Sequence, residues 1–196
     1  MTGPTPAPHP ADVVTAADSA ASPRPPASLA RRLAALGYEV LLLSAVLLSA
    51  GFLLAPFVSP APEAAVARPL PIPDPTARVL SFAALFAVGA LYFGWSWTAG
   101  RRTLPMKTWR IRLTRRDGAV VDRKTALIRY CATWIGPGLA LLGYVALKPT
   151  GQGRYALLLI ALNYLWALAD PDRQFLHDRI AGTRIGLDPP PPAAAR

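Results

Sequence analysis

Cysteine and histidine are scarce in this chain, and their scarcity excludes most disulfide and metal chemistry. The 196 residues contain one cysteine, Cys131, and two histidines, His9 and His177. A single cysteine cannot form an intrachain disulfide or a cysteine-based metal centre. His9 lies in a Pro/Ala-rich segment near the N-terminus, so the remaining histidine has no cluster of partners for a metal. We therefore expect no metal and no cofactor.

The sequence signatures of common enzymes are missing as well. The chain has no G-x-S-x-G, H-E-x-x-H or P-loop pattern. His177 and Asp178 are adjacent in the sequence, which makes a catalytic orientation between them awkward. We therefore predict that the chain is not an enzyme and has no catalytic residues.

Charged residues are few, at 16% of the chain, whereas hydrophobic residues reach 53%. Soluble domains average about 25% and about 45–50%, respectively. The apolar excess falls in four blocks separated by segments rich in proline or arginine, which is typical of membrane spans. The pattern predicts an all-α membrane protein, a four-span helical bundle with spans at about 33–57, 79–97, 126–147 and 155–169.

The segments outside the spans have a different composition. Residues 1–28 are rich in Ala, Pro, Ser and Thr, and they bury too little apolar surface to offset the entropy of ordering, so we expect a disordered tail. No basic segment followed by an apolar run opens the sequence, which argues against a cleaved signal peptide. Residues 59–78 hold six prolines and predict an extended loop. We assign 29–187 to the transmembrane domain and 188–196 to a second Pro/Ala-rich tail.

The segment between spans two and three, residues 98–125, is strongly basic within a chain of net charge +10. Within it, Trp109–Leu113 alternates apolar and basic residues, as strands do. Asp117-Gly118 is a turn signal, and Ala119–Val121 can return as a second strand. We therefore predict a short cytoplasmic β-hairpin, to which Thr183–Leu187 can add a strand.

The basic residues of this hairpin are expected to contact anionic lipid headgroups or a protein partner. Clusters of Lys and Arg beside a membrane span commonly bind acidic lipid. In a soluble protein such a charge would suggest nucleic acid, but here the positive residues flank apolar runs, so we expect no nucleic-acid partner. The four candidate contact residues are Arg110, Arg112, Arg115 and Arg116.

The distribution of Lys and Arg also predicts the orientation of the chain. With four spans and the N-terminus inside, 17 of the 21 Lys and Arg residues fall in cytoplasmic segments and 4 in outer loops. Because positive residues concentrate on the cytoplasmic side of membrane proteins, we predict that both termini are cytoplasmic.

Ionisable residues mark the start of the first span, where Arg31, Arg32 and Glu39 lie. Such groups are costly near lipid, so they are candidate functional residues. Arg32 and Glu39 share a helix face about 10 Å apart along the axis, too far for a direct pair, so each is expected to meet a partner elsewhere. The alternative for the arginines is that they snorkel into the headgroups.

Two residues in the later spans predict local features. Pro137, within Gly136-Pro137-Gly138 of span three, predicts a kink, because proline removes a backbone donor and clashes with the preceding turn. Asn163 is a polar residue within the apolar run of span four. We expect it to bond to a neighbouring helix rather than to a substrate.

Four pieces of the chain, in order, carry a resemblance to a known family. They are Arg31-Arg32-Leu-Ala-Ala, the segment Tyr92–Thr98 with Gly100, Thr103 and Lys107 after it, the turn Asp117-Gly118, and Leu176–Ile185. Over about residues 30–187 the chain resembles the RDD family of small prokaryotic membrane proteins. The resemblance implies a multi-pass protein of the bacterial cytoplasmic membrane. It also implies that transport is a candidate function, since transport is suggested for the family and sodium/proton exchange for some members.

The family is named for one arginine and two aspartates, and these fall on three residues of this chain. The arginine falls on Arg32, with Arg31 as the alternative. The first aspartate falls on Glu39, which keeps the carboxylate but places it one methylene further out, and the second falls on Asp178. The supporting residues are Arg31, His177 and Arg179.

Two functions fit these charges. In the first, Arg32, Glu39 and Asp178 form a salt-bridge network that holds the cytoplasmic segments on the bundle, which is a structural or assembly role. In the second, these charges and His177 form a proton-exchanging cluster for transport of a small ion or solute, because histidine titrates near neutral pH. Four spans are few for a carrier, so transport would call for a homo-oligomer. Access of water to Glu39 would separate the two.

Overall fold

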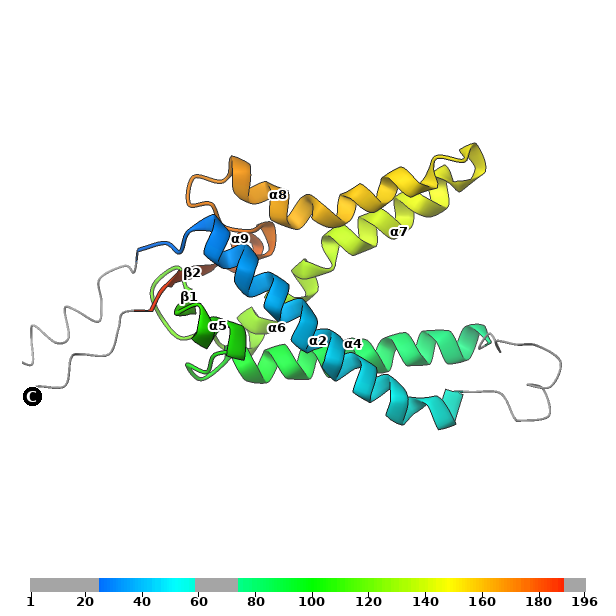
Figure 1. Cartoon of the computed structure of the whole chain (residues 1–196), viewed down its shortest axis with the longest axis horizontal. Helices are drawn as coiled ribbons and strands as arrows, with labels where there is room; N and C mark the ends of the chain where they lie inside the picture. Colours follow the sequence, from blue (N-terminus) through cyan, green and yellow to red (C-terminus); the bar gives the residue numbers. More distant parts are fainter. Residues whose placement is uncertain (1–24, 59–73, 189–196) are drawn as a thin grey trace, which may run out of the picture.

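The structure is a computed structural model that describes residues 25–58 and 74–188 (Figure 1). Residues 59–73 of the predicted proline-rich loop and most of both predicted tails lie outside the described residues. The end of the predicted loop is wrong, because Asp74 caps a helix that begins at Pro75. Residues 25–28, which the sequence assigns to the N-terminal tail, run beside the last strand: Leu187 N donates to Pro25 O at 2.9 Å and Ala27 N to Ile185 O at 3.3 Å.

The described chain is mostly helical, with one small sheet. Two long helices come first, and a compact segment of a short helix, a strand and a third helix follows them. A second helical hairpin, a short helix and a last strand complete the chain. The elements are α2 (Leu29–Val58), α4 (Pro75–Trp97), α5 (Leu104–Thr108), β1 (Ile111–Arg115), α6 (Arg123–Thr133), α7 (Ile135–Leu147), η1 (Lys148–Thr150), η2 (Gly153–Ala161), α8 (Leu162–Ala169), α9 (Leu176–Ala181) and β2 (Thr183–Leu187).

Three helical segments of the described chain are long and apolar enough to cross a membrane: Leu29–Phe57, Pro75–Trp97 and Arg123–Thr150. They correspond to the first three predicted spans. The fourth apolar segment, Gly153–Ala169, is shorter. The count of four spans therefore stays a prediction.

The helices form two arms that meet at one end of the molecule (Figure 1). In one arm α2 packs along α4, and in the other α7 packs along η2. The small elements α5, α6, α9, β1 and β2 gather where the arms meet, which is also where α2 begins. The buried core, which includes Phe93, Trp97, Met106, Ile111 and Tyr130, lies at this junction.

The predicted hairpin is wrong in its second strand. β1 pairs with β2 in antiparallel register, with Ile111 opposite Leu187 and Arg115 opposite Thr183. Residues 119–121 return only far enough for Ala119 O to accept one bond from Arg115 N, at 2.9 Å. The reason lies in the next element, because Asp122 caps α6 by accepting from Thr125 N at 2.7 Å. The chain enters that helix instead of forming a strand, and β2 pairs with the free edge of β1.

The break between α6 and α7 lies at Trp134, three residues before the proline expected to cause a kink. Pro137 has no N–H to donate to Thr133 O, the usual acceptor one turn earlier. The side chain of Asn163 compensates, because its Nδ2 donates to Thr133 O at 2.9 Å and to Ala132 O at 3.1 Å. The predicted bond from Asn163 to a neighbouring helix is therefore confirmed.

Substitution of Gly136 tests the close approach of α7 and η2. An added Cβ would lie 2.8 Å from Ile160 O and 3.0 Å from Leu159 O, and these backbone atoms cannot move aside without shifting a helix. We expect Gly136→Ala to lower the free energy of unfolding by about 1–3 kcal/mol. Denaturant unfolding in detergent micelles, followed by circular dichroism, measures it. Gly138→Ala is the matched control, because nothing lies within 4 Å of its added Cβ. Equal destabilisation of the two variants would contradict the prediction.

Candidate functional site

A buried ion pair joins the third apolar segment to the C-terminal helix. Arg129 on α6 donates from Nε to Asp178 Oδ1 on α9 at 2.8 Å, and the two side chains are 5% and 0% exposed. The same carboxylate oxygen accepts from the hydroxyl of Thr183 at 3.1 Å. The guanidinium also lies 4.1 Å from the ring centre of Trp97, a cation–π distance. The pair therefore binds α4, α6 and the α9–β2 corner into one unit.

His177 completes this group as a neutral acceptor. Its Nε2 lies 3.3 Å from Arg129 Nη2, and since a guanidinium only donates, we assign the imidazole proton to Nδ1. Burial lowers the pKa of His177 to about 4; Asp178 opposes this shift and Arg129 adds to it. The imidazole is therefore uncharged at neutral pH, which does not favour the predicted titration near pH 7.

Asp178 stays ionised for a different reason. Complete burial by itself would raise the pKa of its carboxyl group, but the charge of Arg129 and the hydrogen bonds from Arg129 and the Thr183 hydroxyl outweigh that effect. The net pKa lies below the usual aspartate value. Arg129 and Asp178 thus form a charged pair around neutral pH.

Arg32 faces the interior, whereas Arg31 is exposed. Arg32 is 2% exposed and donates from Nε to Ala27 O at 3.0 Å and from Nη1 to Arg173 O. Its guanidinium also lies 5.7 Å from the ring centre of Phe175. Snorkelling into headgroups is therefore the wrong interpretation for Arg32, which holds backbone carbonyls from two distant segments.

Glu39 is partly buried and bonds only to hydroxyl groups. Oε1 accepts from Tyr92 at 2.8 Å and Oε2 from Thr103 at 2.7 Å. Thr103 also caps α5, with its hydroxyl 3.4 Å from Met106 N. Glu39 therefore joins α2 to the end of α4 and the start of α5.

The ionic contacts differ from the predicted three-residue network. Within residues 25–58 and 74–188, Arg32 and Glu39 make no ion pair, and the carboxylate of Asp178 binds Arg129 instead. In the sequence Arg129 is one of 21 Lys and Arg residues, and no partner is predicted for it. The signal that would have found it is its position inside predicted span three, where a charge needs a partner.

The remaining predicted residues lie outside this buried group. Arg179 pairs with Asp170 and Asp172 in the turn before α9. Of the four basic residues on the predicted hairpin, two already have carboxylate partners. Arg112 pairs with Asp188 at 3.2 Å, and Arg115 pairs with Asp117 and Asp122, both at 3.3 Å; Arg110 and Arg116 are exposed.

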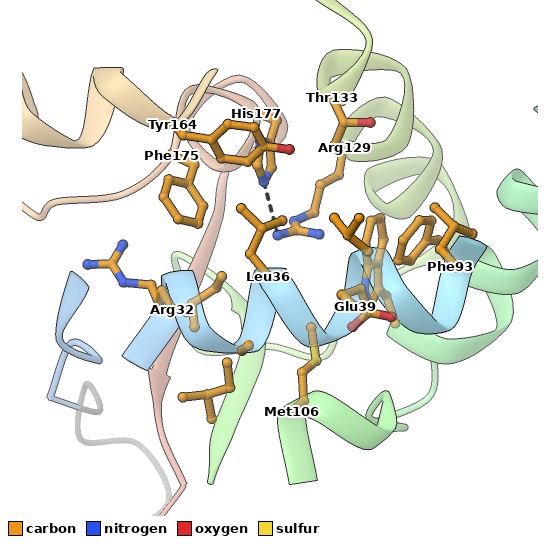
Figure 2. A pocket seen from close by; sticks show the side chains of 16 residues that line it. Arg32, Leu36, Glu39, Phe93, Met106, Arg129, Thr133, Tyr164, Phe175 and His177 are labelled. Carbon is orange, nitrogen blue, oxygen red and sulfur yellow. Dashed lines mark hydrogen bonds between the residues drawn. The ribbon is translucent and has the colours of Figure 1, made fainter. Parts of the chain in front are cut away.

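A cavity of about 150 Å³ lies within this site (Figure 2). Its charged and titratable lining residues are Arg32, Glu39, Arg129, Tyr164 and His177. In Figure 2 Arg32 and Glu39 come from one side, on α2, and Arg129 and His177 come from the other. The structure therefore brings three of the predicted residues to one cavity, while Asp178, the partner of Arg129, is not part of its lining.

The described part of the chain holds no group of three or more His, Cys, Asp or Glu side chains suited to a metal. Among known proteins, the model of the RDD family matches residues 26–182. No curated protein and no solved structure matches the chain.

Asp178→Asn tests the buried pair. The change leaves the Arg129 guanidinium buried without a counter-charge, so we expect a loss of about 3–5 kcal/mol in the free energy of unfolding. Asp172→Asn is the control: that carboxylate is 49% exposed and pairs with Arg179, and a loss under about 1 kcal/mol is expected. Denaturant unfolding of both variants in detergent gives the comparison. A small effect at Asp178 would show that the pair is dispensable.

The neutral state of His177 predicts a pH dependence. The unfolded chain takes up this proton near pH 6.5 and the folded chain only near 4, so stability falls as pH is lowered through that window. The slope should reach up to about 1.4 kcal/mol per pH unit. Replacing the imidazole by His177→Gln removes this contribution, so the variant should lose less stability between pH 6.5 and 4. The free energy of unfolding of wild type and His177→Gln is measured between pH 6.5 and 4. The same loss of stability in both proteins would refute the neutral state of His177.

Proposed function

This chain belongs to the RDD family, and we propose that it is a multi-pass membrane protein with a structural or assembly role. The observation that carries the proposal is the buried pair between Arg129 on α6 and Asp178 on α9. It binds an apolar segment of membrane-span length to the small elements at the junction of the two arms.

The other buried polar contacts support the same role, because each one also joins distant parts of the chain. Arg32 binds the carbonyl of Arg173, 141 residues away, and Glu39 binds the hydroxyl of Thr103, 64 residues away. Each oxygen of Glu39 accepts one hydrogen bond from a hydroxyl. Groups that are already hydrogen-bonded to two other segments suit a lock between segments better than repeated exchange of ions.

Transport of a small ion or solute is the second candidate. The observation that favours it is the position of Glu39, whose partly buried carboxylate lines a cavity together with Arg32, Arg129 and His177. A carboxylate with access to a cavity is the group that a proton-coupled carrier needs. A carrier function would place the exchange at Glu39 rather than at Asp178, which is fully buried.

The membrane arrangement belongs to this proposal. We place the chain in a bacterial cytoplasmic membrane with both termini in the cytoplasm, and the arm of α7, η2 and α8 supplies the third and fourth spans. Arg110 and Arg116, which are exposed beside the sheet, contact anionic headgroups or a partner protein. A second copy of the chain is a candidate partner; nucleic acid is not, and no enzymatic activity is proposed.

Flux measurements in liposomes test the function. The purified protein is reconstituted with an internal pH dye, and gradients of sodium, potassium and protons are applied to wild type, Glu39→Gln and Asp178→Asn. A structural role predicts no cation-dependent response in wild type and early melting of Asp178→Asn. Asp172→Asn, whose carboxylate is half-exposed, is the control and should melt like wild type.

A transport function predicts a different result in the same measurements. A cation-dependent response in wild type that disappears in Glu39→Gln, with unchanged melting of that variant, would replace the structural proposal by the transport function. If the cation-dependent dye response is lost only in variants that also melt early, the loss results from unfolding and not from removal of a transport group.

A further inference from the structure

The cavity at the charge cluster adjoins an apolar groove between the two arms. The groove has a volume of about 310 Å³ and has no charged side chain in its lining. Four residues line both spaces: Leu43, Phe93, Thr133 and Tyr164. Cavity and groove therefore lie side by side, with polar groups in the lining of the first and apolar side chains around the second.

The polar end has more hydrogen-bond donors than acceptors. Arg129 has five N–H groups, and its two recorded bonds go to Asp178 and His177. Trp97 lines the cavity, and its Nε1 is buried without an acceptor within the described residues. Both oxygens of Glu39, in contrast, already accept hydrogen bonds. The space thus favours a ligand that brings acceptor oxygens.

Tyr164 stands where the two spaces meet. Its hydroxyl has no hydrogen-bond partner in the part of the chain that the structure describes, although its ring packs against Phe175 and His177. Figure 2 shows the hydroxyl directed toward the side of the cavity from which Arg129 enters. One hydroxyl therefore lies where the cavity meets the groove, and one guanidinium lines the cavity.

The order of polar and apolar ends matches the depth of a membrane. On α2 the lining runs from Arg32 in the cavity to Leu47 in the groove, about 22 Å further along the helix axis. On α4 it runs from Trp97 at the helix end to Phe82, which is 55% exposed. Trp and Tyr belts mark the interface, so the cavity lies near headgroup depth and the groove within the hydrocarbon.

We propose that this space binds one fatty acid from the membrane, with its carboxylate on Arg129 and Tyr164 and its chain in the groove. The lining of the cavity offers hydrogen-bond donors to a carboxylate, and the lining of the groove offers apolar side chains to one acyl chain. A planar carboxylate also fits the fork of a guanidinium. The site goes beyond the structural role proposed above and uses N–H groups of Arg129 that its contacts with Asp178 and His177 leave free.

Native mass spectrometry of the full-length protein in detergent, titrated with oleic acid, tests the site. We expect one oleate per chain and at least tenfold weaker binding of oleyl alcohol, which lacks the charge. Leu47→Trp fills the groove and should lower oleate binding at least tenfold. Leu41→Trp is the matched control on the same helix, because Leu41 is 70% exposed and lines neither space, and its binding should equal that of wild type.

Tyr164→Phe provides a second variant that keeps the ring packing. Removal of a hydrogen bond to a charged group should weaken oleate binding about tenfold. It decides the question if Leu47→Trp fails to fold, which thermal unfolding would reveal. Absence of a stoichiometric oleate adduct would overturn the proposal. The proposal would also be overturned if oleyl alcohol bound as tightly as oleate, or if phosphatidylglycerol, which has two chains, bound more tightly. Equal oleate binding by wild type, Leu47→Trp and Tyr164→Phe would overturn it as well.

Discussion

The buried pair of Arg129 and Asp178 is the constraint on which the rest of this structure depends. Removing two charges from water costs several kcal/mol for each ion, and only close geometry with further hydrogen bonds offsets it. Here the offset comes from the 2.8 Å contact, the Thr183 hydroxyl and the face of Trp97. Because these groups come from α4, α6, α9 and β2, the pair is stable only when all four elements are in place.

The same requirement explains why sequence analysis found some parts of the site and missed others. Apolar run length predicts the first three spans, and an isolated polar residue in such a run predicts a partner, as at Asn163. The identity of the partner cannot be predicted in the same way for Arg129, because Asp178 lies 49 residues further along the chain. Local patterns carry no information over such a distance. The strand error has the same origin, since the turn at Asp117-Gly118 favours a local hairpin over the distant β2.

The break at Trp134 separates two environments along one apolar segment. α6 carries Arg129 into the junction, while α7 runs out along η2. Asn163 permits this change of direction, because its amide satisfies carbonyls that a continuous helix would have bonded internally. Since the amide comes from α8, the two helices of this arm are also coupled at the point where the arm meets the charge cluster.

Helix length then fixes the depth at which the charges lie. The segments Leu29–Phe57 and Arg123–Thr150 have 29 and 28 residues, so at 1.5 Å per residue their lengths along the helix path are about 42–44 Å, against a hydrocarbon core of about 30 Å. Each must leave about eight residues outside the core. If those are the polar ends, Arg32 and Arg129 lie at the interface. Their burial then comes from protein packing, not from lipid, which is why a cavity with polar lining can exist beside a groove that lipid chains can enter.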